Sequence, residues 1–351
     1  MTGGRDVVGF DPAAVDAWAR VHLTDLTPPF AWRRLDGGHS NLTYHLTDAE
    51  GREAVIRRPP LGELLPKAHD MAREWTMLTA LQPTPAPTPK AYGFCDDPSV
   101  AGARFYVMEF INARPLYRAA DTLEIVPEAR RRDLAFAFID ALADIHALDP
   151  KALGLGDPVR GRSYIARQLA TWRGSWLASV KGARLDDPRA HSLFERLSDS
   201  LIEPDEGCLV HGDYGLHNCL VAEGGRFAAV VDWEIATLGD PLADLAYALN
   251  PWPDPSDPQP PRPEAATSPP GFPPRGALAA RYQARTGRDL SRLPYYTAFN
   301  RWKSAAIIHG VYARYLEGQK SSEGVDLAAL RAQILDLLAG AEAALAALKT
   351  P

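Results

Sequence analysis

The sequence has 351 residues, is 46% hydrophobic and carries a formal net charge of −6, which allows one large core or two smaller ones and does not favour a nucleic-acid partner. Its three cysteines, Cys95, Cys208 and Cys219, have no C-x-x-C spacing, which argues against a disulfide framework or a structural zinc site. Because no apolar run approaches the roughly 20 residues of a membrane-spanning helix and the N-terminus lacks the apolar core of a signal peptide, we expect a cytoplasmic protein without a membrane partner.

The first third of the sequence has the pattern of a small antiparallel sheet accompanied by a helix. Asp11 and Pro12 suit the N-cap and first position of a short helix, and the turn D-A-E-G separates two apolar runs as in a hairpin. Met71, Trp75 and Leu78 have helical spacing. We therefore expect helices over 11–24 and 65–81, and strands near 30–36, 42–47, 53–58 and 104–111.

Helical periodicity dominates from about residue 125 onward, and the pattern changes near 112–116. This change predicts an N-lobe over 1–111 and a helical C-lobe over 112–351, which together make an α+β protein. Proline at the density of residues 251–275 cannot hold a helix or a central strand, so a long loop or mobile flap is expected there. We expect short strands at 208–210 and 228–232, and helices over 127–147, 161–181, 190–202, 241–249, 275–286, 294–317 and 325–348.

Two motifs in the second half carry candidate chemistry, L-V-H-G-D-Y-G-L-H-N at 209–218 and V-V-D-W-E at 230–234. Asp213 and Asn218 follow one expected strand, and Asp232 ends the next. If both loops lie at one sheet edge, they bring together hard-oxygen ligands of the kind that suit Mg²⁺, and a carboxylate not bound to metal can accept a hydroxyl proton. His-x-Asp-x-x-x-x-Asn followed by a strand-end Asp is the order that kinases use.

The N-terminal half adds residues that would suit nucleotide phosphates. Backbone N–H groups of a glycine turn can cradle phosphates, although most such turns are only turns. Arg57 stands on the strand A-V-I-R, and Glu74 lies on or beside the apolar face of the next helix. A carboxylate in that position needs a cationic partner, and Arg57 is the natural candidate. The turn between the first two strands contains Gly37, Gly38, His39, Ser40 and Asn41.

With these motifs the chain resembles the aminoglycoside phosphotransferase family of small-molecule kinases over about 30–320. The most specific strings are L-V-H-G-D-Y-G-L-H-N and V-V-D-W-E-I-A-T-L-G-D-P-L-A-D-L-A-Y. The resemblance implies a bilobal protein-kinase-like fold, with a small antiparallel-sheet N-lobe and a mainly helical C-lobe, that uses ATP and Mg²⁺. Within the family, the chain is most similar to the kinase domain of acyl-CoA dehydrogenase fusion proteins, for which the implied activity is hydroxyacyl-CoA phosphorylation.

The resemblance also implies a role for each matching residue. Asp213 would be the catalytic base or hydroxyl-orienting residue, His211 would brace its loop, and Asp244 would anchor that loop. Asn218 and Asp232 would hold Mg²⁺. Arg57 would contact the nucleotide phosphates and pair with Glu74. The backbone of the segment Met108, Glu109, Phe110 and Ile111 would meet adenine, and the turn of Gly37, Gly38, Ser40 and Asn41 would cradle phosphates.

Two features depart from protein kinases, since Arg57 replaces the usual lysine and Trp233-Glu234 replaces Phe-Gly. No activation-loop phosphosite pattern is found, which argues against a protein kinase. The matching pattern therefore favours an ATP-dependent phosphotransferase that phosphorylates a hydroxyl of a small molecule.

The acceptor is expected to be anionic, because residues 275–320 hold nine basic side chains against two acidic ones. A hydroxyacyl-CoA or a related hydroxy acid derivative fits this charge best, although the same residues could form a solvated basic face. Tyr295, Tyr296, Phe299 and Trp302 either line an acyl pocket or belong to the core. Aminoglycoside or macrolide kinase and nucleotide-binding pseudokinase scaffold stay open as alternatives, as does a metal-dependent hydrolase with ligands His211, Asp213, His217 and Asp232. The sequence leaves the oligomeric state open.

Overall fold

The computed structural model divides the chain into two units, each built from separate segments of sequence. The first unit contains Met1–Tyr117, Asp121–Arg130 and Leu216–Ala236, and the second contains Arg118–Ala120, Arg131–Gly215 and Thr237–Pro351. The single lobe boundary after residue 111 stays a prediction. The structure describes residues 7–35, 41–61, 70–161, 163–201, 207–255, 262–320, 322 and 324–348.

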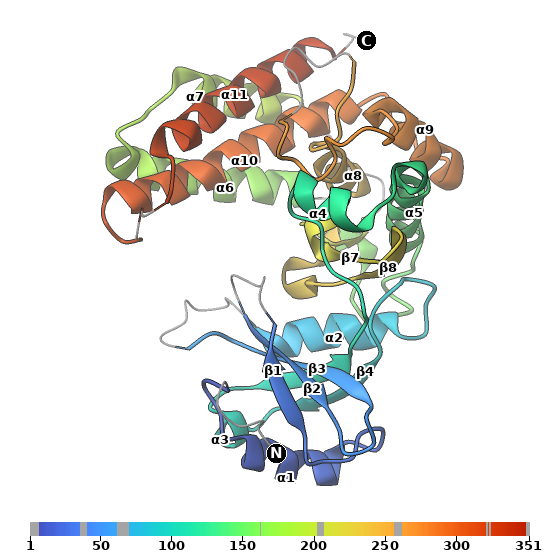
Figure 1. Ribbon diagram of the computed structural model, residues 1–351. Coiled ribbons are helices and arrows are strands. Elements are labelled where there is room, and N and C mark those ends of the chain that lie inside the picture. The colour runs from blue at the N-terminus through green and yellow to red at the C-terminus, as the bar shows by residue number, and fades with distance from the viewer. Residues whose placement is uncertain are drawn as a thin grey trace. The chain divides into compact units, whose positions relative to one another are not determined.

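The first unit is built on a five-stranded antiparallel sheet with the strand order β1-β2-β3-β5-β4 (Figure 1). Strands β2 and β3 have the expected bounds, because their apolar runs are flanked by clear turn residues. Sequence analysis missed β4, whose run A-Y-G-F-C contains a glycine at a register shift. The strands are β1 (Ala31–Arg34), β2 (Leu42–Thr47), β3 (Glu53–Arg58), β4 (Ala91–Cys95) and β5 (Phe105–Glu109).

One helix packs on each face of this sheet, as Figure 1 shows. Phe105 and Val107 of β5 share a buried cluster with α1 (Pro12–His22), whereas Tyr106 and Met108 pack against α2 (Met71–Leu81). This alternation follows from the two-residue period of a strand. Asp11 and Asp70 cap the two helices by accepting backbone hydrogen bonds in the first turn, and a short helix α3 (Pro98–Ala101) precedes β5.

The first unit also contains a two-stranded sheet, and the position of Asp232 relative to this sheet differs from the expected one. The strand near 228–232 is β8 (Arg226–Val230), and it pairs with β7 (Cys219–Ala222), which sequence analysis missed. Asp232 therefore does not end the strand: it lies two residues beyond it, in the left-handed region at φ 69°, and directly precedes the 3₁₀ turn η3 (Trp233–Ile235). The run C-L-V-A and the turn glycines Gly224 and Gly225 make a local hairpin more favourable than the expected pairing.

The second unit is mainly helical, and its largest buried cluster surrounds α10 (Leu293–Leu316). In Figure 1, α6 and α11 run alongside α10. Tyr295, Tyr296, Phe299 and Trp302 all lie in this core, so they do not line an acyl pocket. The other helices are α6 (Tyr164–Ala183), α7 (Pro188–Asp199), α8 (Pro241–Leu249), α9 (Arg275–Thr286) and α11 (Leu327–Ala346), with 3₁₀ turn η1 (Pro158–Gly161). Both α4 (Ala119–Ile125) and α5 (Glu128–His146) are divided between the units.

The expected strand at 208–210 is β6 (Cys208–Val210), and it pairs with β9 (Thr237–Gly239) rather than with β8. The two motif-bearing strands therefore belong to different sheets, and the expectation of one shared sheet edge was wrong. The pairing of β6 with β9 joins residues about thirty positions apart, so local sequence pattern carries no signal for it. The close approach of β9 to β6 requires a glycine at position 239, because a Cβ at Gly239 would lie only 2.7 Å from the side chain of Val210.

Several residues of the proline-rich segment pack within the second unit. Trp252 is buried and contacts the rings of Phe138 and Phe272. Arg131 donates a 2.6 Å hydrogen bond to the carbonyl of Pro270. Among the described helices of both units, none is long and apolar enough to cross a membrane.

Candidate active site

The loop that follows β6 holds His211, Gly212 and Asp213 in the second unit. Its backbone is fixed by Asp244 of α8, whose carboxylate accepts hydrogen bonds from the N–H of His211 at 2.7 Å and of Gly212 at 2.9 Å. Gly212 has φ +84°, a conformation that a side chain disfavours. The contact expected between Asp244 and this loop is therefore present.

Asp244 is itself held by buried hydrogen bonds. His146 lies 3.3 Å from its Oδ2 and also contacts the hydroxyl of Tyr282 at 2.7 Å. Burial alone would raise the pKa of Asp244, but the hydrogen bond and positive field of His146 together with the N–H groups of the loop lower it overall. The loop is thus anchored on an ionised, buried carboxylate.

The carboxylate of Asp213 is fixed from the side by Tyr247. The Tyr247 hydroxyl donates a hydrogen bond to Oδ1 of Asp213, and the Asp213 N–H donates to Nδ1 of His211 at 3.3 Å. Burial and the nearby Asp213 raise the pKa of Tyr247 well above its ordinary value, so the tyrosine stays a donor. The sequence pattern did not predict a role for Tyr247, although this residue stands three positions after Asp244 and thus on the same face of α8.

A second group of charged residues lies in the first unit, where Arg57 of β3 joins two carboxylates. Its Nη1 lies 2.9 Å from Glu74 Oε1, and its Nη2 lies 2.6 Å from Asp232 Oδ1. Glu74 is 1% exposed and Arg57 is 9% exposed. The expected Arg57–Glu74 pair is confirmed, whereas the bond from Arg57 to Asp232 was not anticipated.

Burial dominates the ionisation of Glu74. It raises the pKa of Glu74 to about 7, and Arg57 only partly opposes this rise while Asp232 and Glu234 reinforce it. The hydroxyl of Tyr106 also lies against this carboxylate and favours its charged form. Glu74 is therefore the side chain of this group whose charge should change between mildly acidic and mildly basic solution.

This titration should make stability depend on pH. The pKa of Glu74 is higher in the folded state than in the unfolded state, so the protonated acid stabilises the fold. This contribution is complete below the unfolded-state pKa, near 4.5, and is lost as the pH rises through the folded-state pKa of about 7. Relative to Glu74→Gln, the unfolding free energy of the unmodified protein should fall by at most about 3 kcal/mol between pH 5 and pH 8. Urea unfolding of both proteins across this range checks the prediction. A difference that stays constant with pH would show that Arg57 keeps Glu74 ionised throughout.

Asn218 and Asp232 stand at the same end of the β7–β8 hairpin. The N–H of Val231 donates to the Asn218 carbonyl at 2.9 Å, and the first ladder pair beyond them joins Cys219 to Val230. An amide oxygen and a carboxylate are hard-oxygen ligands, and Mg²⁺ commonly takes only one or two protein ligands beside substrate phosphates. This pair of residues therefore fits Mg²⁺, with one oxygen of Asp232 bonded to Arg57.

The remaining expected nucleotide residues lie in the first unit or outside the described residues. Asn41 donates to Oε2 of Glu234 at 3.4 Å. Met108 and Glu109 end β5, and both the backbone and the side chain of Glu109 form hydrogen bonds with the backbone of Lys90. The ring of Phe110 packs edge-on against His45, with 4.3 Å between the ring centroids. The carbonyl of Ile111 accepts from Ala113. Their contact with adenine stays a prediction, and Gly37, Gly38 and Ser40 lie outside the residues that the structure describes.

The metal-dependent hydrolase alternative required a cluster of His and Asp ligands. Within the described ranges, no three side chains of His, Cys, Asp or Glu come together as metal ligands.

The fold and these charged groups define the class of protein. A five-stranded antiparallel sheet with a buried Arg–Glu pair, together with a helical unit that carries a His-x-Asp loop, is typical of the protein-kinase-like α+β fold, and similarity to solved kinase structures confirms this fold. The model of the phosphotransferase enzyme family matches residues 31–296. The chain therefore belongs to this family of small-molecule kinases.

Three known proteins illustrate the similarity. The rat protein named acyl-CoA dehydrogenase family member 11 is 35% identical over 337 residues, which cover 93% of this chain but only 42% of the rat protein. A solved structure assigned as an aminoglycoside phosphotransferase from Ralstonia eutropha has a TM-score of 0.81 at 27% identity and covers 97% of this chain and 100% of its own. A spectinomycin phosphotransferase solved with ADP and spectinomycin has a TM-score of 0.62 at 12% identity, covers 95% and 98% of the two chains, and shows the fold alone.

Proposed function

We propose that this chain transfers the γ-phosphoryl group of ATP to a hydroxyl of a small hydroxyacyl acceptor, of which a hydroxyacyl-CoA is the best representative. Family membership supports phosphoryl transfer to a small molecule. The name of the rat relative supports an acyl-CoA compound, although this chain corresponds to only 42% of that protein. ADP in the spectinomycin phosphotransferase structure supports an adenine nucleotide as the phosphoryl donor.

The arrangement around Asp213 is the observation that carries the proposal. The two N–H groups bonded to Asp244 fix the loop backbone, and the Tyr247 hydroxyl fixes one oxygen of the Asp213 carboxylate. With its carboxylate held by Tyr247, Asp213 is the residue that we assign to the hydroxyl of the acceptor. In the proposed reaction, the acceptor oxygen forms a bond to the γ-phosphorus, the bond to the bridging oxygen of ADP breaks, and the hydroxyl proton passes to Asp213.

The first unit would bind the phosphoryl donor. Asn218 and Asp232 would hold Mg²⁺, which when bound neutralises charge on the phosphate oxygens. Arg57 would contact the nucleotide phosphates, and its bonds to Glu74 and Asp232 would set the position of its guanidinium. The turn of Gly37, Gly38, Ser40 and Asn41 and the backbone of Met108–Ile111 are proposed nucleotide contacts on the resemblance alone.

The two rival functions differ in what they require. A scaffold that binds nucleotide without transferring phosphate has no need of a residue that accepts the hydroxyl proton, yet Asp213 is present beside the intact pair Asn218 and Asp232. An aminoglycoside kinase must accept a polycationic acceptor, and the ammonium of Lys303 in the electrostatic field of Asp213 would repel one.

The test is ADP release from Mg-ATP in the presence of single acceptors. We would compare 3- and 4-hydroxybutyryl-CoA, the free hydroxy acids, kanamycin, erythromycin, choline and glucose at pH 7.5. The expected result is acceptor-dependent ADP release with the hydroxyacyl compounds, together with a phosphorylated product of matching mass. Release confined to kanamycin or erythromycin would replace the proposal with antibiotic phosphorylation, and nucleotide binding without release for every acceptor would favour a scaffold.

A further inference from the structure

Lys303 of α10 is a buried ammonium in the second unit. The residue is 7% exposed. No hydrogen bond or ion pair joins its side chain to any other residue in the ranges that the structure describes. Its Nζ lies over two aromatic rings instead, 5.6 Å from the centroid of Tyr247 and 6.0 Å from that of Trp172.

A cation in this position is costly without a ligand. An ammonium taken out of water loses its hydration, and cation–π contacts at these distances replace only part of it. Burial lowers the pKa of Lys303, whereas the charges of Asp244 and Asp213 raise it, so the ammonium lies within the electrostatic field of the proposed base. An oxygen of a bound ligand would supply the missing hydrogen bond.

Other basic residues of the same region already have partners. Arg281 bonds Asp140, and Arg285 bonds Asp144. Arg288 donates to the carbonyl of His146 and Arg301 to that of Gly340. Part of the excess positive charge counted over 275–320 is thus paired within the chain, and Lys303 is the buried basic residue of that region among the described residues.

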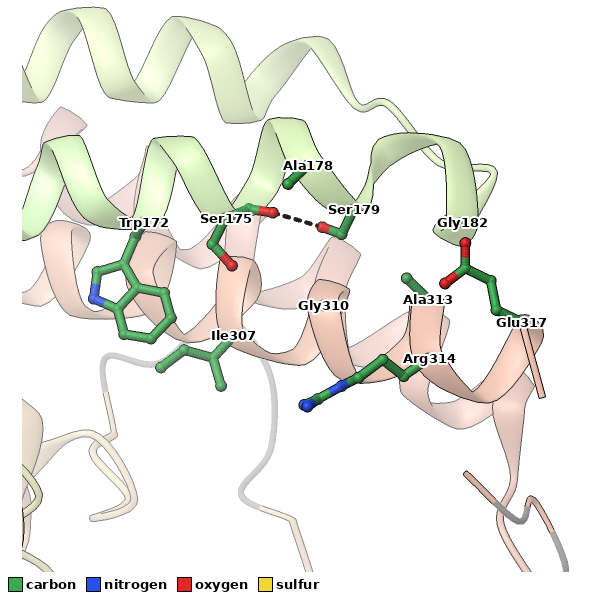
Figure 2. A pocket seen from close by; sticks show the side chains of 10 residues that line it. All are labelled: Trp172, Ser175, Ala178, Ser179, Gly182, Ile307, Gly310, Ala313, Arg314 and Glu317. Carbon is green, nitrogen blue, oxygen red and sulfur yellow. Dashed lines mark hydrogen bonds between the residues drawn. The ribbon is translucent and has the colours of Figure 1, made fainter. Parts of the chain in front are cut away.

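A cavity of about 410 Å³ lies between α6 and α10, and Trp172 is one of its lining residues. Figure 2 shows Trp172 at one end of the cavity with Ile307 across from it. Ile307 is one helical turn after Lys303, so both side chains lie on the same face of α10. The cavity and Lys303 thus share the ring of Trp172, which lines the cavity and lies 6.0 Å from Nζ. Its lining includes Trp172, Ser175, Ser179, Ile307, Gly310 and Arg314.

We infer that Lys303 recognises the acceptor by donating a hydrogen bond to an acyl oxygen close to the hydroxyl that faces Asp213. This inference rests on the proposed function, and it identifies the acyl oxygen as the group by which the site selects its acceptors. Tyr247 links the two ends of the site, because its hydroxyl bonds Asp213 and its ring lies under Lys303. The acyl oxygen is the carboxylate of a free hydroxy acid or the thioester carbonyl of its CoA derivative.

Steady-state kinetics of Lys303→Gln and Lys303→Arg test the inference with three acceptors, 3-hydroxybutyrate, 3-hydroxybutyryl-CoA and the neutral 1,3-butanediol. For Lys303→Gln, kcat/KM should fall about 10- to 100-fold for an acceptor with an acyl oxygen and stay within about 3-fold for the diol, with the KM for ATP unchanged. Lys303→Arg should recover part of the loss. A fall with the free acid alone identifies the carboxylate, and a fall with both identifies the oxygen common to acid and thioester.

Calorimetric binding without ATP separates this inference from the proposed reaction. The unmodified protein should bind 3-hydroxybutyrate or 3-hydroxybutyryl-CoA, and Lys303→Gln should bind it about 10-fold or more weakly, whether or not transfer is detected. An equal loss of kcat with all three acceptors would make Lys303 a counter-ion of Asp213 and overturn the inference. Equal binding by both proteins, or binding of neither probe by the unmodified protein, would overturn it as well. Thermal unfolding of each variant reports whether it is folded.

Discussion

Asp213→Asn is expected to lower kcat for phosphoryl transfer by about 10²- to 10⁴-fold, the range that a positioned general base contributes. The amide keeps the size of the side chain and can still bond Tyr247, but it cannot accept the proton of the acceptor hydroxyl. ATP binding should stay within about 2-fold, because the change removes an interaction with the acceptor. Product formation by mass spectrometry and nucleotide binding by calorimetry measure the two effects separately.

Asp199→Asn is the matched control for this experiment. Asp199 ends α7 in the same unit and is exposed, so the same change of charge there should leave kcat within about 2-fold. If Asp213→Asn also turned over at the rate of the unmodified protein, Asp213 would not be the base. A loss of ATP binding in that variant would instead assign the residue to the nucleotide site.

Sequence pattern predicted local structure well wherever residues close in the chain determine it. The bounds of β2, β3, α8 and α9 match the expected ranges, because apolar periodicity, caps and turn residues all act within a few positions. The missed strands β4, β7 and β9 have three to five residues each. Their pairing is set by tertiary contacts, and short apolar runs carry little signal of their own.

In the candidate site, too, some contacts could be predicted from the sequence and others could not. Glu74 could be paired with Arg57 from sequence, because a carboxylate beside an apolar helix face needs a cation and the preceding strand supplies one. The bond from Arg57 to Asp232 spans 175 positions, and only the folded chain reveals it. Lys303 gives a weak signal, since it stands in an apolar helix, N-R-W-K-S-A-A-I-I, where a lysine can also extend to solvent.

Replacing Arg57 by methionine is expected to destabilise the protein by about 3 kcal/mol and to abolish detectable transfer. The change leaves Glu74 buried without its cation, and removing one partner of a buried pair costs about 3–5 kcal/mol. The lower end applies because a buried Glu74 can escape part of the cost by taking up a proton. Urea unfolding and ADP release measure stability and transfer in the same preparation.

The double variant Arg57→Met with Glu74→Leu separates stability from chemistry. Apolar side chains of similar volume can replace a buried ion pair at little cost, so the double variant should regain most of the lost stability. It should not regain transfer, because neither residue can position a charge on the nucleotide phosphates or bond Asp232. A double variant that recovered activity together with stability would make Arg57 a structural residue only.

Arg104→Met provides the control for removing an arginine from the first unit. Arg104 pairs with Asp96 at 2.7 Å, but the two side chains are 53% and 70% exposed, and such pairs contribute about 0–1 kcal/mol. Stability and transfer should both stay close to those of the unmodified protein. The contrast between Arg104 and Arg57 would then follow from burial and from the second carboxylate, Asp232, which makes the guanidinium of Arg57 part of the proposed metal and phosphate site.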